Sequence, residues 1–213
     1  YNPEATESFQ EGILIPPVKL FKEGKLDQDL VNILSANSRL PNSLYGDLNG
    51  QINALDLGEE RLHSLLDEYT EEKITSALKE LRKRTEKMMR QHIGALPNET
   101  ISVEDYLDND GVTDDPLTLA IDLTIKDDKM TIDFSRSSNA CAGPVNISKS
   151  TTIAATYVAL KHIFTDVPAN AGVLKPVKFI IPEDSFLNVR APKPVGGYTC
   201  LLYTSDAADE LLG

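Results

Sequence analysis

Residues 117–134 read LTLAIDLTIKDDKMTIDF, and this stretch decides the fold class. Apolar and polar side chains alternate twice along it, first over residues 117–125 and again over residues 130–134. A period of two is typical of a β-strand with one buried face. Because Asp127 and Asp128 stand between the two runs, the stretch predicts two antiparallel strands joined as a hairpin.

The part of the chain before this hairpin has the period of helices instead. Asp27 occupies an N-cap position ahead of a short predicted helix that runs to about Ser38. Over residues 44–69 apolar side chains recur at close to 3.6 residues, and a second such series runs from Thr70 until Gly94 stops it. We expect these two long amphipathic helices to pack as an antiparallel pair.

The remaining segments complete the predicted architecture. Residues 11–26 contain a Pro-Pro pair and suit an extended segment, because proline removes a backbone donor. A third helix is predicted over residues 151–164 and a further strand over residues 177–181. Helices first and strands later predict an α+β fold, in which the long antiparallel helix pair packs with a mainly antiparallel β-sheet.

Composition excludes several classes of function. The chain has 213 residues, of which 41% are hydrophobic, enough for a globular core. Its net charge of -12 argues against nucleic acid and against an anionic membrane surface as partners, since both need clustered basic side chains. No apolar run approaches the ~20 residues that span a bilayer, and no signal peptide is recognisable. We therefore expect a cytoplasmic protein with no membrane partner.

Both ends of the sequence are unusual. The chain starts at Tyr1 in what reads as the middle of a segment, which predicts a truncation. Residues 200–210, CLLYTSDAADE, can be back-translated codon for codon to the adapter end used in transposase-based sequencing libraries. The predicted layout is thus a partial domain over residues 1–199, truncated at both ends, followed by a non-native tail over residues 200–213.

Four stretches taken together carry a family resemblance. In this order and at these separations they resemble the hydantoinase B/5-oxoprolinase family and, more distantly, the large subunit of acetone carboxylase. The resemblance covers essentially all of residues 1–199. The stretches are QEGILIPPVKL (10–20), GDLNGQINA (46–54), MTIDFSRSSNACAGPVN (130–146) and DVPANAGVLKPVKFIIPEDSFLNV (166–189).

The resemblance implies a fragment of the hydrolytic subunit of an ATP-dependent enzyme that opens small cyclic amides such as hydantoin or 5-oxoproline. ATP is expected on a hydantoinase A-type partner subunit or domain, in a hetero-oligomer, and this chain has no Walker-type phosphate loop. The family's metal-associated His and Asp motifs would precede Tyr1, so a divalent metal is expected only in the intact protein and the fragment alone is expected to be inactive. The alternatives are an acetone carboxylase-type carboxylase and a non-catalytic scaffold.

Three carboxylate or amide side chains are the catalytic candidates. Asp47 and Gln51 are four residues apart, so they share one face of a predicted helix, next to Gly46 and Gly50. They match a GDL-x-x-Q pattern of the family, although a solvated face or a favourable helix-dipole position would explain them equally. Glu11 matches a family position in the Gln-Glu-Gly run, and a solvent-facing loop carboxylate is the alternative.

Four further residues are candidates for binding the substrate. Asp133, Ser137 and Asn146 lie on or after the second strand of the hairpin, in a loop that leads to a helix whose N-terminus offers N–H groups to an anion. Asn170 precedes Gly172 in another of the family stretches. All four have a simpler interpretation as exposed or turn-forming residues.

Histidine and cysteine give no catalytic or metal pattern. His63, His92 and His162 are dispersed and none has a second ligand at a convincing spacing, so we interpret all three as structural or exposed. Cys141 lacks a paired histidine and is a poor candidate for a nucleophile. The sequence therefore predicts no metal ligand.

Overall fold

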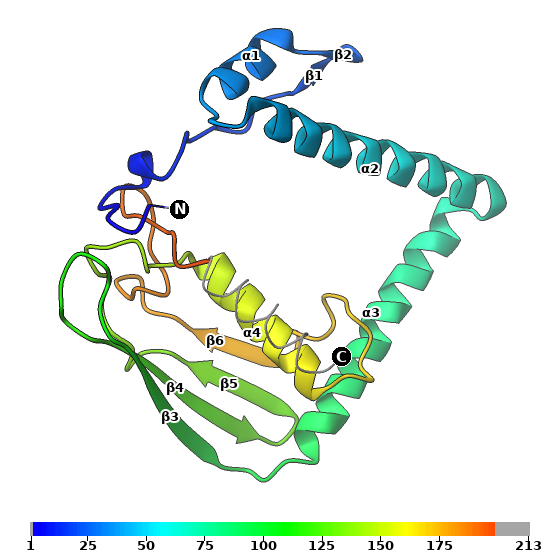
Figure 1. Ribbon diagram of the computed structural model, residues 1–213. Helices are drawn as coiled ribbons and strands as arrows, with labels where there is room; N and C mark the ends of the chain where they lie inside the picture. The colour runs from blue at the N-terminus through cyan, green and yellow to red at the C-terminus, as the bar shows by residue number, and fades with distance from the viewer. Residues whose placement is uncertain (1, 199–213) are drawn as a thin grey trace, which may run out of the picture. The chain divides into compact units, whose positions relative to one another are not determined.

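The computed structural model describes residues 2–198, drawn in Figure 1. The chain divides into two compact units, the helical unit of residues 13–79 and the sheet unit of residues 2–12 and 80–198. The α+β class with a mainly antiparallel sheet is as predicted. Within the described residues, none of the helices combines the length and apolar character needed to cross a lipid bilayer. The predicted non-native tail of residues 200–213 lies outside the described residues.

The helical unit starts with the extended segment that its prolines predicted. That segment ends in a two-stranded hairpin, and its turn places Gly24 at φ 74°, a conformation that glycine adopts without strain. A short helix and a long helix follow. The elements are β1 (Phe21–Lys22), β2 (Lys25–Leu26), α1 (Gln28–Ala36) and α2 (Pro41–Glu68).

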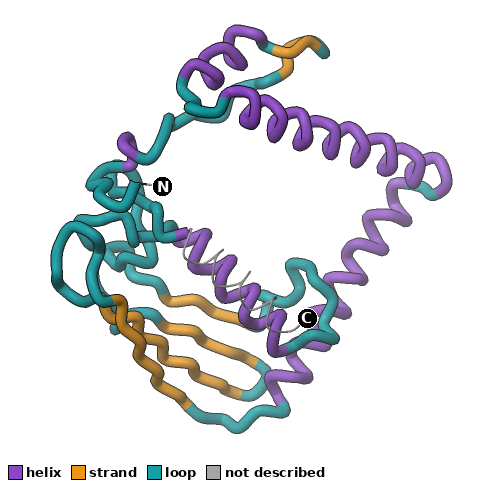
Figure 2. The backbone as a smooth tube through the Cα atoms, viewed as in Figure 1, coloured by secondary structure: helices purple, strands orange, loops and turns teal. Residues whose placement is uncertain are grey.

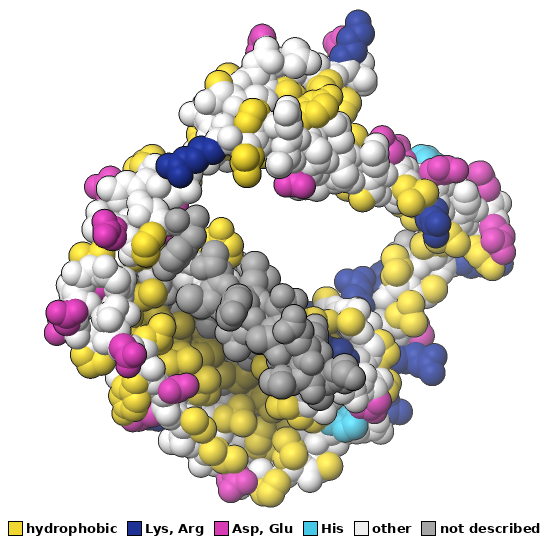
Figure 3. Space-filling model, in the orientation of Figure 1, with side chains coloured by type: hydrophobic (Ala, Val, Ile, Leu, Met, Phe, Trp, Pro, Cys, Tyr) yellow, Lys and Arg dark blue, Asp and Glu magenta, His cyan; other side chains and the backbone are white. Residues whose placement is uncertain are grey.

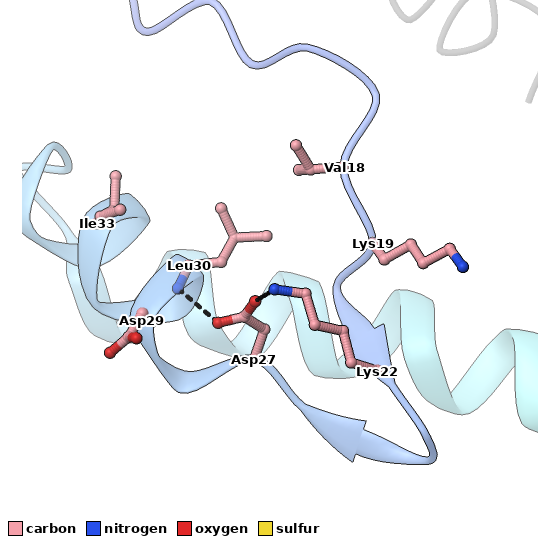
Figure 4. Close-up of a pocket in the computed structure, with 7 residues that line it drawn as sticks. All are labelled: Val18, Lys19, Lys22, Asp27, Asp29, Leu30 and Ile33. Carbon is pink, nitrogen blue, oxygen red and sulfur yellow. Dashed lines mark hydrogen bonds and ion pairs between the residues drawn. The ribbon is translucent and has the colours of Figure 1, made fainter.

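Asp27 caps α1 as the sequence predicted. Its carboxylate accepts a hydrogen bond from the backbone N–H of Leu30 at 3.3 Å and pairs with Lys22 at 2.5 Å (Figure 4). The hydrogen bond from Lys22 is the main reason that the pKa of Asp27 is lowered. Apolar side chains of Leu30, Ile33 and Val18 lie around this cap, which ties the start of α1 to the preceding hairpin.

α2 covers the predicted helical stretch up to Glu68, one residue short of its expected end, but its apolar stripe is exposed. None of its residues is buried, and Leu55 and Leu62 are 74% and 50% exposed. The next helix lies mostly in the other unit, so its predicted antiparallel packing with α2 stays a prediction. Within the helical unit, α2 packs against α1.

The sheet unit is a four-stranded sheet in the order β3-β4-β5-β6 (Figures 1 and 2). The first three strands are antiparallel, and β6 joins the edge in parallel to β5. The predicted hairpin is β4–β5, with Asp127 at φ 55° in its turn. The elements are a 3₁₀ turn (Ser8–Gln10), α3 (Glu71–Gly94, which begins in the helical unit), β3 (Thr100–Leu107), β4 (Leu117–Lys126), β5 (Lys129–Asp133), α4 (Lys149–Ile163) and β6 (Val177–Ile180).

The core lies between one face of this sheet and two helices. Met89 and Ile93 of α3 are fully buried, and Leu160 of α4 packs in the same cluster with Ile132 of β5. α4 crosses that sheet face in Figure 1, and hydrophobic side chains gather on the same face in Figure 3. Burial of these side chains supplies the main stabilisation of the unit, at roughly 25 cal/mol per Å² of apolar surface.

Strand β3 was not predicted. It is an edge strand whose side chains are all exposed except that of Leu107. Polar and apolar residues alternate over residues 100–104, until Asp105 interrupts the pattern. Ion pairs help to hold β3 to its neighbour, because Arg136 pairs with both Glu104 of β3 and Asp122 of β4. Hydrogen bonds from Arg136, and then from Ser102, lower the pKa of Asp122 to about 2.

Candidate functional site

The loop that follows β5 continues the hydrogen bonding of the sheet with side chains. Ser137 Oγ accepts from the N–H of Ala120 at 3.0 Å and donates to the carbonyl of the same residue at 2.9 Å. Ser138 Oγ accepts from the N–H of Thr118 at 2.8 Å. The carboxylate of Asp133 accepts from the N–H of Ser135 at 2.8 Å and so fixes the turn out of the strand. Two predicted substrate contacts, Asp133 and Ser137, therefore shape the loop.

Asn146 is the centre of the next part of the loop. Its side chain is fully buried, and its Nδ2 donates to the carbonyls of Gly143 at 2.8 Å and Cys141 at 3.2 Å. Its Oδ1 accepts from the N–H of Cys141 at 2.9 Å. Every polar atom of the amide is thus satisfied inside the loop. This amide holds the loop closed, and direct contact of Asn146 with a ligand stays a prediction.

Asp110, which sequence analysis did not single out, anchors this loop from outside. It is only 1% exposed, and its carboxylate accepts hydrogen bonds from the N–H groups of Thr113 at 2.6 Å, Gly143 at 2.8 Å and Val112 at 2.9 Å. Burial opposes ionisation, but these backbone hydrogen bonds outweigh it and lower the pKa of Asp110 to about 2. A buried carboxylate with this many donors stays ionised at neutral pH without a cation.

Gly143 makes that anchoring possible. A side chain at this position would overlap the backbone carbonyl oxygen of Asp110. Only glycine lets the two backbone segments approach so closely. The sequence signal that could have located the pair is the Gly143-Pro144 step, but its partner is 33 residues away and periodicity does not reveal it.

Cys141 lies in the same cluster and is a poor nucleophile. Burial is the main reason that the pKa of its thiol is raised to about 11, and the charge of Asp110 adds to the shift. Its Sγ lies 3.2 Å from Asn146 Oδ1, an acceptor that favours the protonated thiol. The thiolate is therefore scarce at neutral pH, in agreement with the sequence-based interpretation.

The outer side of the loop borders an open groove in which opposite charges face solvent. Glu183 and Asp184 supply carboxylates, whereas Arg190 and Lys193 supply cations. Lys193 Nζ donates to the carbonyl of Cys141 at 3.2 Å, which links the groove to the loop. Within residues 2–198, no ion pair engages Glu183, Asp184 or Arg190. The two cations can attract a carboxylate or a phosphorylated group, and the full lining is Asn139, Ala140, Glu183, Asp184, Val189, Arg190 and Lys193.

Glu11 and Asn170 tie other segments of the sheet unit together. Glu11 Oε2 accepts from the N–H of Val195 at 2.7 Å, so the half-buried carboxylate joins the first residues of the chain to the segment after Arg190. Asn170 donates to Thr85 Oγ1 at 2.8 Å and accepts from the N–H of Gly172 at 2.8 Å. Both side chains have a structural role here, and their functional roles stay predictions.

Asp47 and Gln51 lie in the helical unit, on consecutive turns of α2. Both side chains are exposed, and a Cβ added to Gly46 or Gly50 would meet nothing within 4 Å. The helix itself therefore does not require either glycine. The loop described above belongs to the other compact unit, so a shared site for the two groups of residues stays a prediction.

Each of the three histidines has a polar contact of its own. His92 Nε2 is 3.0 Å from Asp166, and His162 Nδ1 is 2.9 Å from the carbonyl of Val158. His63 lies 3.7 Å from Glu59 on α2. Among residues 2–198 no three His, Cys, Asp or Glu side chains gather as a metal-binding group, so these residues do not fit a metal ion.

Comparison with known proteins identifies the family of this chain. The family model described as Hydantoinase B/oxoprolinase matches residues 1–208, a range that enters the segment predicted to be non-native. The chain belongs to the hydantoinase B/oxoprolinase family. The beta subunit of the caprolactamase of Pseudomonas jessenii, one of its relatives, is 29% identical over 197 residues, which are 91% of this chain and 34% of that protein.

Solved structures agree with the family assignment. The crystal structure of the ATP-dependent caprolactamase from Pseudomonas jessenii matches 99% of this chain and 38% of its own with a TM-score of 0.83 at 28% identity. A nucleotide-free acetone carboxylase matches 92% of this chain and 28% of its own with a TM-score of 0.83, but its 15% identity shows a shared fold alone. The chain spans about a third of the length of the curated relatives it matches.

Proposed function

We propose that this chain is part of the hydrolytic subunit of an ATP-dependent cyclic-amide hydrolase. The observation that carries the proposal is the match over 99% of the chain to a caprolactamase that is named as ATP-dependent. Caprolactam, hydantoin and 5-oxoproline are all cyclic amides, and the relatives of this chain include enzymes named for each of them. The proposed substrate is therefore a small cyclic amide, with hydantoin and 5-oxoproline as the first compounds to test.

The partner is proposed to be a hydantoinase A-type subunit or domain that binds ATP. Two relatives, a hydantoinase and the caprolactamase, are each named as one subunit of an enzyme, which supports a divided architecture. In the proposed reaction, the γ-phosphoryl group of ATP activates the amide, and this chain takes part in the hydrolysis of the phosphorylated intermediate. No step is assigned to a metal ion, because the described residues do not fit one.

Two groups of residues would serve this reaction differently. Arg190 and Lys193, at the rim of the groove, would attract the anionic intermediate by their charge. The exposed pair Asp47 and Gln51 would be completed into a site by other parts of the assembled enzyme, as would Glu11 if it acts in catalysis. The buried residues Asp110 and Asn146 would keep the groove wall fixed.

The test is reconstitution of the complete subunit with its partner subunit. Release of phosphate and of the ring-opened amino acid should both be measured with hydantoin, 5-oxoproline and caprolactam, with and without ATP. We expect turnover only when ATP and both subunits are present. Turnover by the hydrolytic subunit alone without ATP would refute the proposal, and ATP hydrolysis that requires acetone and bicarbonate would indicate the carboxylase alternative.

A further inference from the structure

The second half of α3 is basic in an otherwise acidic chain. Residues 80–90 contain five Lys or Arg and two Glu, a net charge of +3, which leaves -15 for the rest of the -12 chain. All of these residues belong to the sheet unit. A local reversal of charge on one helix calls for a physical explanation, because the composition as a whole argues against basic surfaces.

The basic side chains and the buried side chains lie on different faces of α3. Thr85 and Met89 are buried, and they lie four residues apart on the face that packs into the unit. Lys83, Arg84 and Lys87 are exposed and point away from that face, by about a third to a half of a turn. With Glu80, Glu86 and Arg90 they line an open groove along the helix.

Among the described residues, Arg90 is held by local ion pairs, whereas the three cations of the exposed side are not. Arg90 pairs with Glu86 at 2.8 Å and with Asp128 at 3.2 Å. Within the described chain Lys83, Arg84 and Lys87 form no ion pair. Lys83 and Lys87 are like charges at i and i+4, an unfavourable spacing on a helix. The helix dipole favours cations only in the last turn, which these residues precede.

We propose that the α3 basic face, defined as Lys83, Arg84 and Lys87, is a docking surface for an acidic segment of the ATP-binding partner subunit. This inference rests on the proposed function. A short acidic protein segment fits better than nucleic acid, because it can contact this face alone, whereas a long polyanion would also meet the acidic residues that dominate the rest of the chain. Leu81, which is 53% exposed beside the face, adds an apolar contact of the kind that protein interfaces use.

The test compares two charge-reversed variants of the complete subunit. Lys83→Glu with Lys87→Glu reverses the face, and Lys126→Glu with Lys129→Glu makes the same change in charge on exposed lysines of the β4–β5 hairpin. Binding to the purified partner subunit is measured by biolayer interferometry at about 50 mM and about 300 mM NaCl, because the distance over which exposed charges interact becomes shorter as the salt concentration rises. Thermal melting confirms that both variants are folded.

We expect the α3 variant to bind at least about tenfold more weakly at low salt, with a smaller difference at high salt, whereas the hairpin variant should bind like the wild type. The inference would be overturned if the α3 variant bound the partner as tightly as the wild type, or if both variants lost the same affinity. It would also be overturned if the wild type formed no complex with the partner. A duplex DNA probe, or a second copy of this chain in sedimentation velocity, that binds the wild type and is lost in the α3 variant would overturn it as well. A normal salt-sensitive complex without ATP-dependent hydrolysis would refute the proposed function alone.

Discussion

In the sheet unit, Asn146 and Asp110 are buried and hydrogen-bonded several times over, whereas the candidates of the helical unit stand exposed on α2. Asn146 satisfies every polar atom inside its loop, and Asp110 accepts from three backbone N–H groups. Asp47 and Gln51 have no comparable surroundings within their unit. The contrast predicts that changes at Asp110 and Asn146 act through stability, and that changes at Asp47 and Gln51 act through activity.

The largest expected effect is that of Asp110→Ala. The substitution removes the acceptor of three backbone N–H groups, of which that of Gly143 is buried, and we expect a loss of about 3 kcal/mol in the free energy of unfolding. Urea denaturation of the complete subunit measures it. Asp108→Ala, at an exposed position two residues earlier, is the matched control and should change stability by less than about 0.5 kcal/mol. Equal effects at both positions would contradict the anchoring role.

A pair of glycine substitutions compares the two regions directly. Gly143→Ala forces a Cβ into the backbone of Asp110, so a loss of about 2 kcal/mol is expected. Gly50→Ala adds a Cβ into open space on α2 and should instead stabilise the helix by up to about 1 kcal/mol. Thermal melting gives the sign of each change. A destabilising Gly50→Ala would show that α2 is packed more closely in the complete protein than in this unit.

The pH dependence of stability should carry the signature of Asp110. Its folded-state pKa of about 2 lies below the ordinary value, so the ionised form contributes stability above about pH 4 that is lost as the pH falls through about 2. Between about pH 5 and about pH 2 the wild type should lose about 2 kcal/mol more than Asp110→Asn. Parallel losses in the two proteins, measured by urea denaturation, would rule out this assignment.

The exposed residue Asp47 should affect activity and leave stability almost unchanged. Asp47→Asn in the reconstituted enzyme should lower turnover by at least about tenfold, equivalent to about 1.4 kcal/mol, while the thermal midpoint stays within a few degrees. A merely solvated side chain would change neither quantity, and a structural one would lower both together. Glu59→Gln, also exposed on α2, is the control for loss of a carboxylate on this helix.

Much of the fold could be predicted because periodicity reports which face of an element is buried. The β4–β5 hairpin, α1 with its Asp27 cap and the strand at residues 177–180 all follow from local pattern. The predicted third helix is α4, which begins two residues earlier than expected, after the cap Ser148. Strand β3 was not predicted, because Asp105 interrupts its alternation and almost all of its side chains are exposed.

The sequence by itself determined the family, the order of most helices and strands, and the acidic character of the chain. The tertiary structure alone decided which polar residues are held inside. Asp110 meets Gly143 across 33 residues, Glu11 meets Val195 across 184, and Asn170 meets Thr85 across 85. Such partners cannot be read from spacing along the chain, because a hydrogen bond depends on distance in space, and only folding brings these backbone and side-chain groups within its reach.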